Sequence, residues 1–354
     1  MKLLHTADWQ LGLKLRFLSE EGGRRERARL RRYEVVRELA ELAHREKVDA
    51  VVVAGDVFDD NAVGPGTLQQ ARDALAAFDS IPVLLLPGNH DPLTPDSVLL
   101  RLEAAPMVHI LDTTDPVSLG ETLFYPAPLT SHLYRDDPSR HLPTLPAQRE
   151  RFAVVVAHGG VSHFGESERE SSAIIDTRRI LDKGYDYVAL GDWHGLKEID
   201  PRVWYPGTPE ATRSKEKKPG YALLVTLDSP GSIPVVEPLR VGRSQWVRDR
   251  RHLSAAGDLE RMLSEWDALP ERSWTSLKAW LSGTIDLQES SRLHAWMEKR
   301  EGEFLHMAIS LEDLIETVDV EALSVGSDLT GIVAETVDSL QQEESEASRD
   351  ALRV

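Results

Sequence analysis

The sequence contains no cysteine among its 354 residues. Disulfide bonds and thiolate ligands are therefore excluded, and a metal site would have to use nitrogen and oxygen ligands. The sequence also lacks an apolar run of about 20 residues, the length that a membrane-spanning helix needs. Its N-terminus carries no signal-peptide pattern. We therefore expect a cytoplasmic protein with no membrane association.

Positive charge is scarce relative to negative charge. The chain has 41 Lys and Arg against 59 Asp and Glu, a formal net charge of −18, which argues weakly against a nucleic-acid partner. The charge is uneven, because residues 301–350 hold 14 acidic residues and one arginine, or about −13 of the total. The first 300 residues are nearly balanced and contain basic clusters, so net charge does not decide whether DNA is a partner.

Length and composition predict two or three domains. Around residues 228–251 the chain becomes rich in Pro, Gly, Ser and Arg, which is typical of a domain boundary. We expect a first domain at 1–240, a small α+β capping domain at 241–316, and an acidic tail at 317–354. The tail contains an amphipathic helix at 329–341, whose apolar face suits either docking to a partner or packing on its own domain.

Five short apolar runs in the first 200 residues predict buried strands. They span 2–7, 50–54, 81–86, 152–157 and 187–190. Each run ends in residues that are able to bind a metal: Asp8 with Gln10, Asp56, Asn89 with His90, His158, and Asp192 with His194. Because ligands collect beyond the carboxyl ends of strands in α/β sheets, we expect these side chains to converge on one edge.

Oxygen and imidazole ligands in this number suit divalent ions such as Mn²⁺, Mg²⁺, Fe²⁺ or Zn²⁺. Seven candidate ligands are too many for one ion with an open position, whereas two ions that share a carboxylate would use them all. Such pairs commonly hydrolyse phosphoesters. A Gly-Asp after one strand is more often a turn than a ligand, so the prediction rests on the joint occurrence of five motifs. We expect Trp9 and Trp193 to pack beneath the site, and His5 to be a core or surface residue.

The order of these motifs resembles the calcineurin-like metallophosphoesterases. The motifs are Asp8-Trp9-Gln10, Gly55-Asp56-Val57-Phe58-Asp59, Gly88-Asn89-His90-Asp91, His158 and Gly191-Asp192-Trp193-His194. Within that family, the segment Tyr205-Pro206-Gly207-Thr208-Pro209-Glu210 is most similar to SbcD-type DNA repair nucleases. The resemblance covers roughly residues 1–240.

The resemblance implies an α/β four-layer sandwich, with two mixed β-sheets flanked by helices and a small α+β C-terminal cap. It implies a metal-dependent exonuclease and endonuclease that acts on DNA, in repair or in defence against foreign DNA. It also implies an SbcC-like SMC-type ATPase as partner, and a homodimer is consistent with it.

Roles for individual residues follow from the same resemblance. Asp56 would bridge two divalent ions, Asp8, Gln10 and His194 would complete one ion, and Asn89, His158 and Asp192 would complete the other. His90 would protonate the leaving oxygen or steady the phosphate, and Asp91 or a nearby carboxylate would orient it.

Two positions depart from the family pattern. Gln10 and Asp192 stand where histidine is usual, and each replaces a nitrogen ligand by oxygen. The harder ligand set favours Mn²⁺, or Mg²⁺, over Zn²⁺. Two alternatives stay open: the enzyme binds a single ion, or its second ion arrives with the substrate.

Two basic clusters are candidates for DNA contacts, with a solvated surface as the alternative. One contains six arginines within residues 24–32, including Arg24 and Arg25, and the other contains Lys215 and Lys217. Two other functions also remain open: hydrolysis of a small phosphodiester or phosphomonoester at the same site, and a non-catalytic scaffold.

Overall fold

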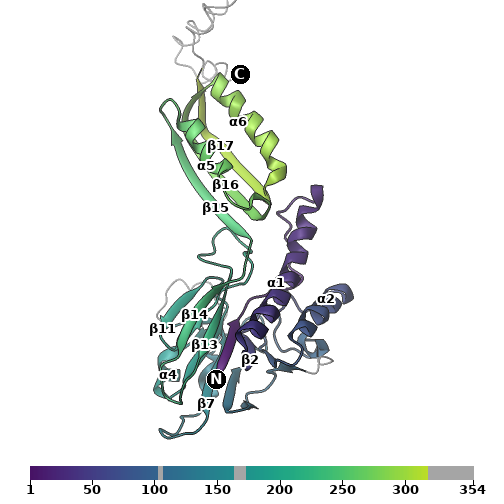
Figure 1. Cartoon of the computed structure of the whole chain (residues 1–354), viewed down its shortest axis with the longest axis vertical. Helices are drawn as coiled ribbons and strands as arrows, with labels where there is room; N and C mark the ends of the chain where they lie inside the picture. Colours follow the sequence, from purple (N-terminus) through teal and green to yellow (C-terminus); the bar gives the residue numbers. More distant parts are fainter. Residues whose placement is uncertain (103–106, 163–172, 318–354) are drawn as a thin grey trace, which may run out of the picture. The chain divides into compact units, whose positions relative to one another are not determined.

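The computed structural model describes residues 1–102, 107–162 and 173–317. The chain divides into two units, Met1–Gln245 and Trp246–Val354 (Figure 1). In the first unit, the amides of Val241 and Gly242 both donate to the Gly220 carbonyl oxygen. The expected tail helix at 329–341 lies outside the described residues.

Two six-stranded sheets form the first unit. The strands of the first sheet are β1 (Lys2–Thr6), β2 (Ala50–Val53), β3 (Val83–Leu85), β4 (Val108–Ile110), β13 (Tyr221–Thr226) and β14 (Val235–Arg240). Their order is β14-β13-β1-β2-β3-β4. The strands of the second sheet are β5 (Val117–Leu119), β6 (Thr122–Ala127), β7 (Phe152–His158), β10 (Tyr187–Gly191), β11 (Lys197–Asp200) and β12 (Val203–Tyr205). Their order is β11-β12-β10-β7-β6-β5.

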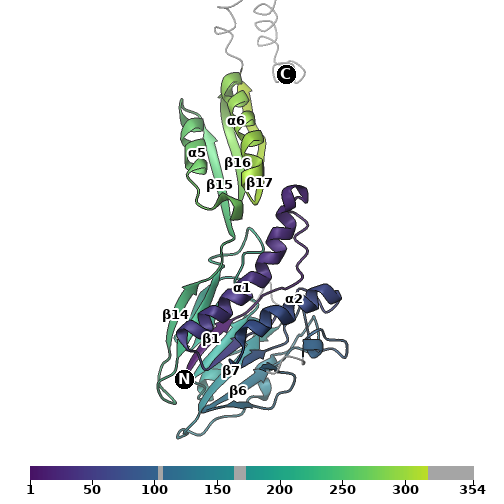
Figure 2. The same ribbon diagram turned by 45° about the vertical axis from the view of Figure 1, so that its right-hand side comes forward.

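Three helices and a short strand pair complete this unit. The helices are α1 (Arg24–Glu46), α2 (Pro65–Leu75) and α4 (Thr177–Asp182), and the pair is β8 (Gly160–Val161) with β9 (Ile174–Ile175). Figure 2 shows α1 and α2 side by side over the first sheet. Pro65 occupies the first turn of α2, where its missing N–H costs nothing.

Alternating side chains of the strands form three hydrophobic clusters. Val51 and Val53 of β2 pack under α1, while Val52 points to the other face, against the second sheet. The outer face of the second sheet packs against α4 and the loops around it. The layers are therefore helices, sheet, sheet and helix, which confirms the predicted four-layer sandwich.

Strand direction brings the predicted motifs to one edge. In the first sheet β1, β2 and β3 are parallel neighbours, and in the second sheet β7 and β10 are parallel neighbours. Both faces of these strands are covered, as parallel sheets require. The two sheets are joined by His5, whose Nδ1 lies 2.9 Å from the Tyr187 hydroxyl and whose Nε2 lies 3.2 Å from the Leu190 carbonyl oxygen.

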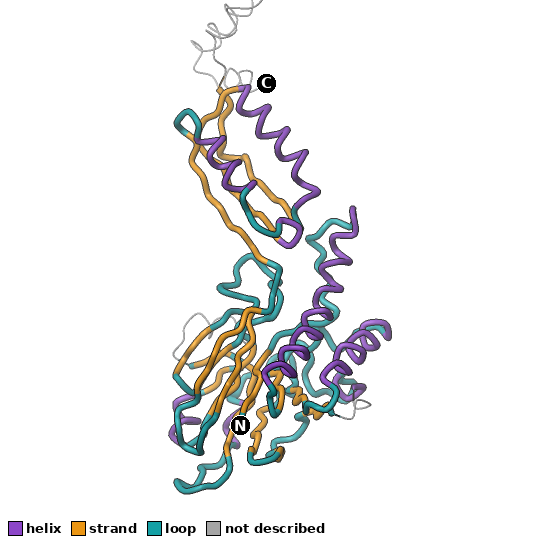
Figure 3. Tube along the Cα trace, in the orientation of Figure 1, coloured by secondary structure: helices purple, strands orange, loops and turns teal. Residues whose placement is uncertain are grey.

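The second unit is a three-stranded sheet with two helices. Its elements are β15 (Gln245–Leu253), α5 (Asp258–Asp267), β16 (Thr275–Asp286), α6 (Leu287–Arg300) and β17 (His306–Thr317). The strand order is β15-β16-β17, with β16 and β17 parallel. Figure 3 shows the helices of this unit in purple beside its strands in orange. Asp286 and Glu289 form a capping box that starts α6. Among the described residues, no helix is both long and apolar enough to cross a membrane.

Candidate metal centre

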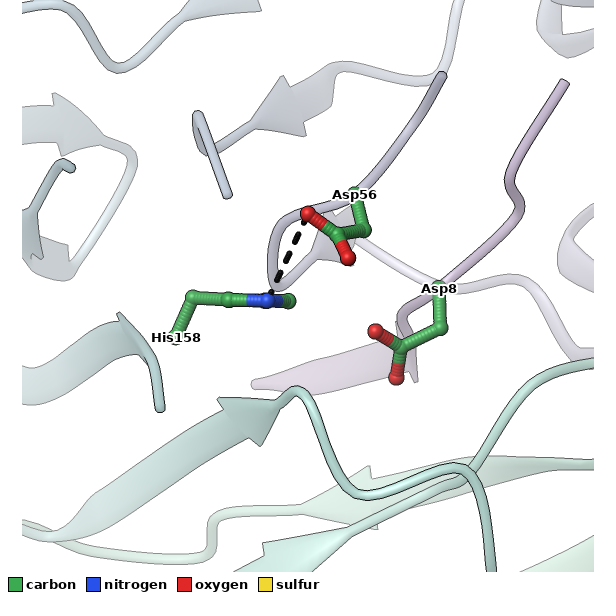
Figure 4. A group of neighbouring side chains, drawn as sticks. All are labelled: Asp8, Asp56 and His158. Atoms are coloured by element: carbon green, nitrogen blue, oxygen red, sulfur yellow. Dashed lines mark ion pairs between the residues drawn. The ribbon is translucent and has the colours of Figure 1, made fainter. Parts of the chain in front are cut away.

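The carboxyl ends of β1, β2 and β7 hold three buried ligand-type side chains. One carboxylate oxygen each of Asp8 and Asp56 and one ring nitrogen of His158 lie within 4.8 Å of one another (Figure 4). Asp56 Oδ1 lies 3.4 Å from His158 Nε2. Two carboxylates and an imidazole at this spacing are a typical hard-cation site.

His158 turns one nitrogen toward a group of oxygens. Its Nδ1 lies 2.8 Å from the Ala54 carbonyl oxygen, so Nδ1–H donates there. Its Nε2 then faces Asn89 Oδ1 at 2.9 Å and Asp192 Oδ1 at 3.8 Å, in addition to Asp56. Acceptor atoms that converge in this way need a cation or a proton between them.

The buried carboxylates perturb one another's pKa values. Burial raises the pKa of Asp8 to about 6, although His194 and His158 oppose this. Burial would also raise the pKa of Asp56, but the charge and hydrogen bond of His158 bring it down to about 2. Burial would lower the pKa of His158, but Asp56, Asp8 and Asp192 raise it well above its usual value. Excess negative charge in a dry site is what a divalent ion would neutralise.

Gln10 and His194 form a second part of the site. Gln10 Nε2 lies 3.3 Å from His194 Nε2, and Gln10 Oε1 is buried with no hydrogen-bond partner in the described structure. An orphaned buried oxygen is costly unless something pairs with it. The amide of Asp192 joins this part to the first, since it donates to Asp8 Oδ1 at 3.1 Å. The buried Gln10 oxygen beside His194 therefore fits a bound cation, as the group of Asp8, Asp56 and His158 does.

The backbone at the site is held in unusual conformations. Asp8, Gln10, Asp56 and Asp192 all have positive φ, at 53°, 45°, 52° and 97°. Such residues cost of order 1 kcal/mol or more each and cluster at functional sites. Gly88 lies so close that a Cβ there would be 2.1 Å from Asp56 Oδ1, which explains why glycine precedes Asn89.

His90 lies at the rim, about one-third exposed. Its amide donates to Asp56 Oδ1 at 2.9 Å. Its Nδ1 lies 2.9 Å from the Asp59 carbonyl oxygen and 3.7 Å from Asp59 Oδ1. Nδ1–H therefore donates to Asp59, and Nε2 is the nitrogen that can exchange a proton with a ligand.

Asp91 contacts the backbone of two loops and not the His90 ring. Its buried carboxylate accepts the amides of Phe58 and Gly88, both at 2.9 Å. Burial, and then the charge of Asp56, raise its pKa to about 7. Asp91 joins the two loops that carry Asp56 and Asn89, and the nearby carboxylate beside the His90 ring is that of Asp59.

A pocket of about 570 Å³ opens over the site. Its lining combines two groups of residues: Asp56, Asn89, His90, Asp192 and His194, and Arg213, Ser214, Lys215 and Lys217. Trp193 lines it too and is half-buried. Trp9 is buried and stacks on Phe78, with ring centroids 6.5 Å apart, as expected for core packing.

Two functional contacts were missed in the sequence because they link distant segments. Glu216 Oε1 lies 2.8 Å from His194 Nδ1, so it orients the ring as carboxylates behind metal-bound histidines do. Arg32 is buried and donates to the carbonyl oxygens of Trp9 and Gln10. The only sequence signals were a glutamate inside a lysine-rich loop and an arginine inside the 24–32 cluster.

Other arginines of the 24–32 cluster are buried or bonded to neighbouring residues of the protein. Arg31 is buried between Glu210 and Glu38. Arg25 donates to the carbonyl oxygens of Leu18 and Arg16, and Arg24 is buried. DNA contacts by Arg24 and Arg25 stay a prediction.

Residues 1–196 match the family of calcineurin-like phosphoesterases. The chain belongs to this family. Calcineurin-like phosphoesterases are hydrolases that use divalent metals, and the candidate site lies within or just beyond the matched residues.

Curated relatives carry a more specific name. The chain is 26% identical to the D subunit of the SbcCD nuclease of Bacillus subtilis (strain 168), over 92% of this chain and 90% of that one. It is 35% identical to the D subunit of the SbcCD nuclease of Rhodobacter capsulatus, over 32% of this chain and 27% of that one. A solved structure, TT1561 of Thermus thermophilus, is 14% identical with a TM-score of 0.43, and covers 68% of this chain and 98% of that one.

Proposed function

We propose that this calcineurin-like phosphoesterase is a DNA nuclease that hydrolyses phosphodiester bonds with two divalent ions. The observation that carries the proposal is that the acidic, imidazole-containing cluster lines the same pocket as Arg213, Lys215 and Lys217. Such a pocket combines ligands for cations with groups that attract a phosphate. The names of the two curated relatives, which are nuclease subunits, support a nucleic acid as the substrate.

In this proposal Asp8, Gln10 and His194 would hold one ion, and Asn89, His158 and Asp192 would hold the other. Asp56 would contribute to both. When bound, such ions lower the pKa of a water molecule and stabilise the charge that develops on the phosphoryl oxygens. Nitrogen ligands number only two, His158 and His194, so Mn²⁺ or Mg²⁺ fits better than Zn²⁺.

Side chains of the protein supply the proton transfer and the charge balance that the reaction also needs. His90 Nε2 donates a proton to the leaving oxygen, and Asp59 holds the other ring nitrogen. Lys215 and Arg213 balance the charge of the scissile phosphate. Glu216 holds the His194 proton on Nδ1, so that Nε2 is available to an ion.

The cellular setting is proposed on the same grounds. We place the protein in the cytoplasm, in DNA repair or defence against foreign DNA, with an SbcC-like SMC-type ATPase as partner and a homodimer as its form. Residues 1–240 would form the nuclease domain, 241–316 the cap, and 317–354 a tail for the partner.

A second candidate has one observation in its favour. The pocket volume of about 570 Å³ lies in the range of small-molecule sites, so a cyclic dinucleotide or other small phosphodiester would fit. The experiment therefore compares end-labelled single-stranded and duplex DNA with a cyclic dinucleotide and a chromogenic phosphodiester, each in Mn²⁺, Mg²⁺ or EDTA.

Matched variants make the result specific. Asp56→Ala and His90→Ala are compared with Asp73→Ala on α2 and His44→Ala at the end of α1, which are outside the pocket. We expect metal-dependent DNA loss that both control variants keep and both site variants lose. Cleavage of the small diesters alone would favour the second candidate, and no cleavage of any substrate by metal-loaded protein would overturn both.

A further inference from the structure

Among the described residues of the second unit, helices cover one face of the three-stranded sheet, and the other face is open. Leu277, Ala279 and Leu281 of β16 pack against α5 and α6 in one hydrophobic cluster. Residues that alternate with them point away from the helices. On this open face β15 presents Arg248, Arg250 and His252, which are exposed, and β16 presents Lys278 and Trp280, which are half-exposed.

Three cations surround one aromatic ring on the open face. The guanidinium carbons of Arg248 and Arg250 lie 5.6 and 5.1 Å from the centroid of the Trp280 ring, and Lys278 Nζ lies 5.2 Å from it. A single cation–π contact at an exposed site is worth about 0.5–1 kcal/mol. An indole ring has only two faces on which a cation can lie. Cation–π contact with Trp280 alone therefore does not explain why three cations gather around it.

These three charges have no acidic counterpart in the described part of the chain. Within residues 1–102, 107–162 and 173–317, no carboxylate lies within ion-pair distance of Arg248, Arg250 or Lys278. Their neighbour Arg251, on the covered face, is paired with both Asp249 and Glu265. Within the described residues these like charges therefore repel one another with no carboxylate nearby, and a bound anion would relieve that repulsion.

An aromatic pair lies on the same face as Trp280. Trp246 of β15 is half-exposed, and its ring centroid lies 6.0 Å from that of His306 on β17. Toward the opposite end of the sheet, Asp313 of β17 pairs in register with Ser282. The positive, aromatic part of the face therefore lies between Trp246 and Trp280.

We propose that this face binds a single strand of nucleic acid. Phosphates would contact Arg248, Arg250 and Lys278 and draw these cations away from the ring, and a base would then stack on Trp280 in their place. The charge of the face matches a polyanion, and an aromatic ring among cations favours unpaired bases, whose faces are accessible. This inference rests on the proposed function in one respect: it takes the bound strand to be the substrate of the nuclease.

The test is fluorescence anisotropy of a labelled 20-nucleotide oligothymidine with the full-length protein in EDTA, which prevents hydrolysis. We expect Trp280→Ala to weaken binding about tenfold or more, and Trp280→Phe to keep most of it, because a ring still stacks. Arg248→Ala/Arg250→Ala should reduce the slope of log K against log salt concentration by roughly 1.4, twice the single-strand value of about 0.7 per phosphate contact.

The charge-matched control is Arg261→Ala/Arg292→Ala. These arginines lie on α5 and α6 and pair with Asp258 and Glu260, so this double variant should bind as the wild type does. Equal loss in both double variants, or wild-type binding by Trp280→Ala, would overturn the proposal, as would undetectable binding by the wild type.

The DNA-hydrolysis assay is read separately. If Trp280→Ala binds normally while the protein still degrades DNA, the face is not the binding site and the nuclease proposal stands. If the face binds the strand but metal-loaded protein hydrolyses no DNA, the nuclease proposal fails and the binding face stands.

Discussion

Glu216 Oε1 lies 2.8 Å from Nδ1 of His194, at the edge of the pocket that holds the candidate metal centre. Burial disfavours a charged Glu216, but the hydrogen bond and charge of His194 lower the pKa of Glu216 overall. The ionised carboxylate thus fixes the proton of His194 on Nδ1. It also accepts the amide of Thr212 at 2.8 Å, which ties the basic loop to the metal centre.

Substitution of Glu216 should therefore act on metal binding. We expect Glu216→Ala to lower the affinity for Mn²⁺ by about 10- to 100-fold, the usual effect of removing the partner of a metal-bound histidine. Glu216→Gln should have a smaller effect because its amide oxygen still accepts from Nδ1. Isothermal titration with Mn²⁺ measures both, with the exposed Glu198→Ala as control. Unchanged affinity in Glu216→Ala would show that His194 does not bind the ion.

Arg32 stabilises the loop that carries the first metal motif. Its guanidinium donates to the Trp9 carbonyl oxygen at 2.7 and 2.9 Å and to the Gln10 carbonyl oxygen at 3.2 Å. Arg32→Met would leave the Trp9 oxygen without these donors, while the Gln10 oxygen still accepts the amide of Leu13. One unsatisfied buried group costs about 1–3 kcal/mol, so we expect the free energy of unfolding to fall by about that amount in urea denaturation. Arg29→Met, on an exposed turn of the same helix, should change it by less than about 0.5 kcal/mol.

Buried His5 makes stability depend on pH. Burial lowers the pKa of His5 from 6.5 to about 3 in the folded protein, so between these values the unfolded chain binds a proton that the folded chain does not. The stabilising contribution of neutral His5 is complete above pH 6.5 and decreases as the pH falls toward 3. Between pH 7 and pH 5 the loss is about 2 kcal/mol.

The matched variant is His5→Gln, which does not titrate and keeps a donor for the Leu190 carbonyl oxygen. Urea denaturation of both proteins at about pH 7 and about pH 5, in EDTA, gives the comparison. The wild type should lose about 2 kcal/mol more than the variant. Parallel losses would show that His5 is already protonated, or is solvated, in the folded protein.

The convergence of the candidate ligands was predictable because each follows a buried strand. A run such as Val51-Val52-Val53 followed by Gly-Asp determines both the strand and the place of Asp56 at its end. Parallel pairing then brings Asp8 and Asp56 together without further information. The four-layer arrangement was predicted from the resemblance to the calcineurin-like metallophosphoesterases. The hydrophobic clusters on both faces of each sheet confirm it.

Contacts between distant segments were not predictable in this way. In the sequence Glu216 is one acidic residue among lysines. Its contact with His194 depends on the close approach of two backbone segments, since a Cβ on Gly195 would lie 2.0 Å from the Lys217 carbonyl oxygen. Arg32 looks like its neighbours in a basic cluster, and only the packing of α1 decides that it is buried. The open face around Trp280 depends on which side of the sheet the helices cover, which strand alternation alone does not specify.

Gln10 offers the sharpest test of the ligand set, because it departs from the family pattern. Its Oε1 is buried without a partner in the described structure, and its backbone has a φ of 45°, a conformation that histidine also adopts. Gln10→His adds a nitrogen ligand, so we expect tighter binding of the second ion and a shift from Mn²⁺ toward Zn²⁺. Metal content after dialysis against equal Mn²⁺ and Zn²⁺ measures the shift, with Gln69→His on α2 as control. If Gln10→His binds the same ions in the same amounts as the wild type, residue 10 is not a ligand, and Asp8 and His194 would have to hold that ion without it.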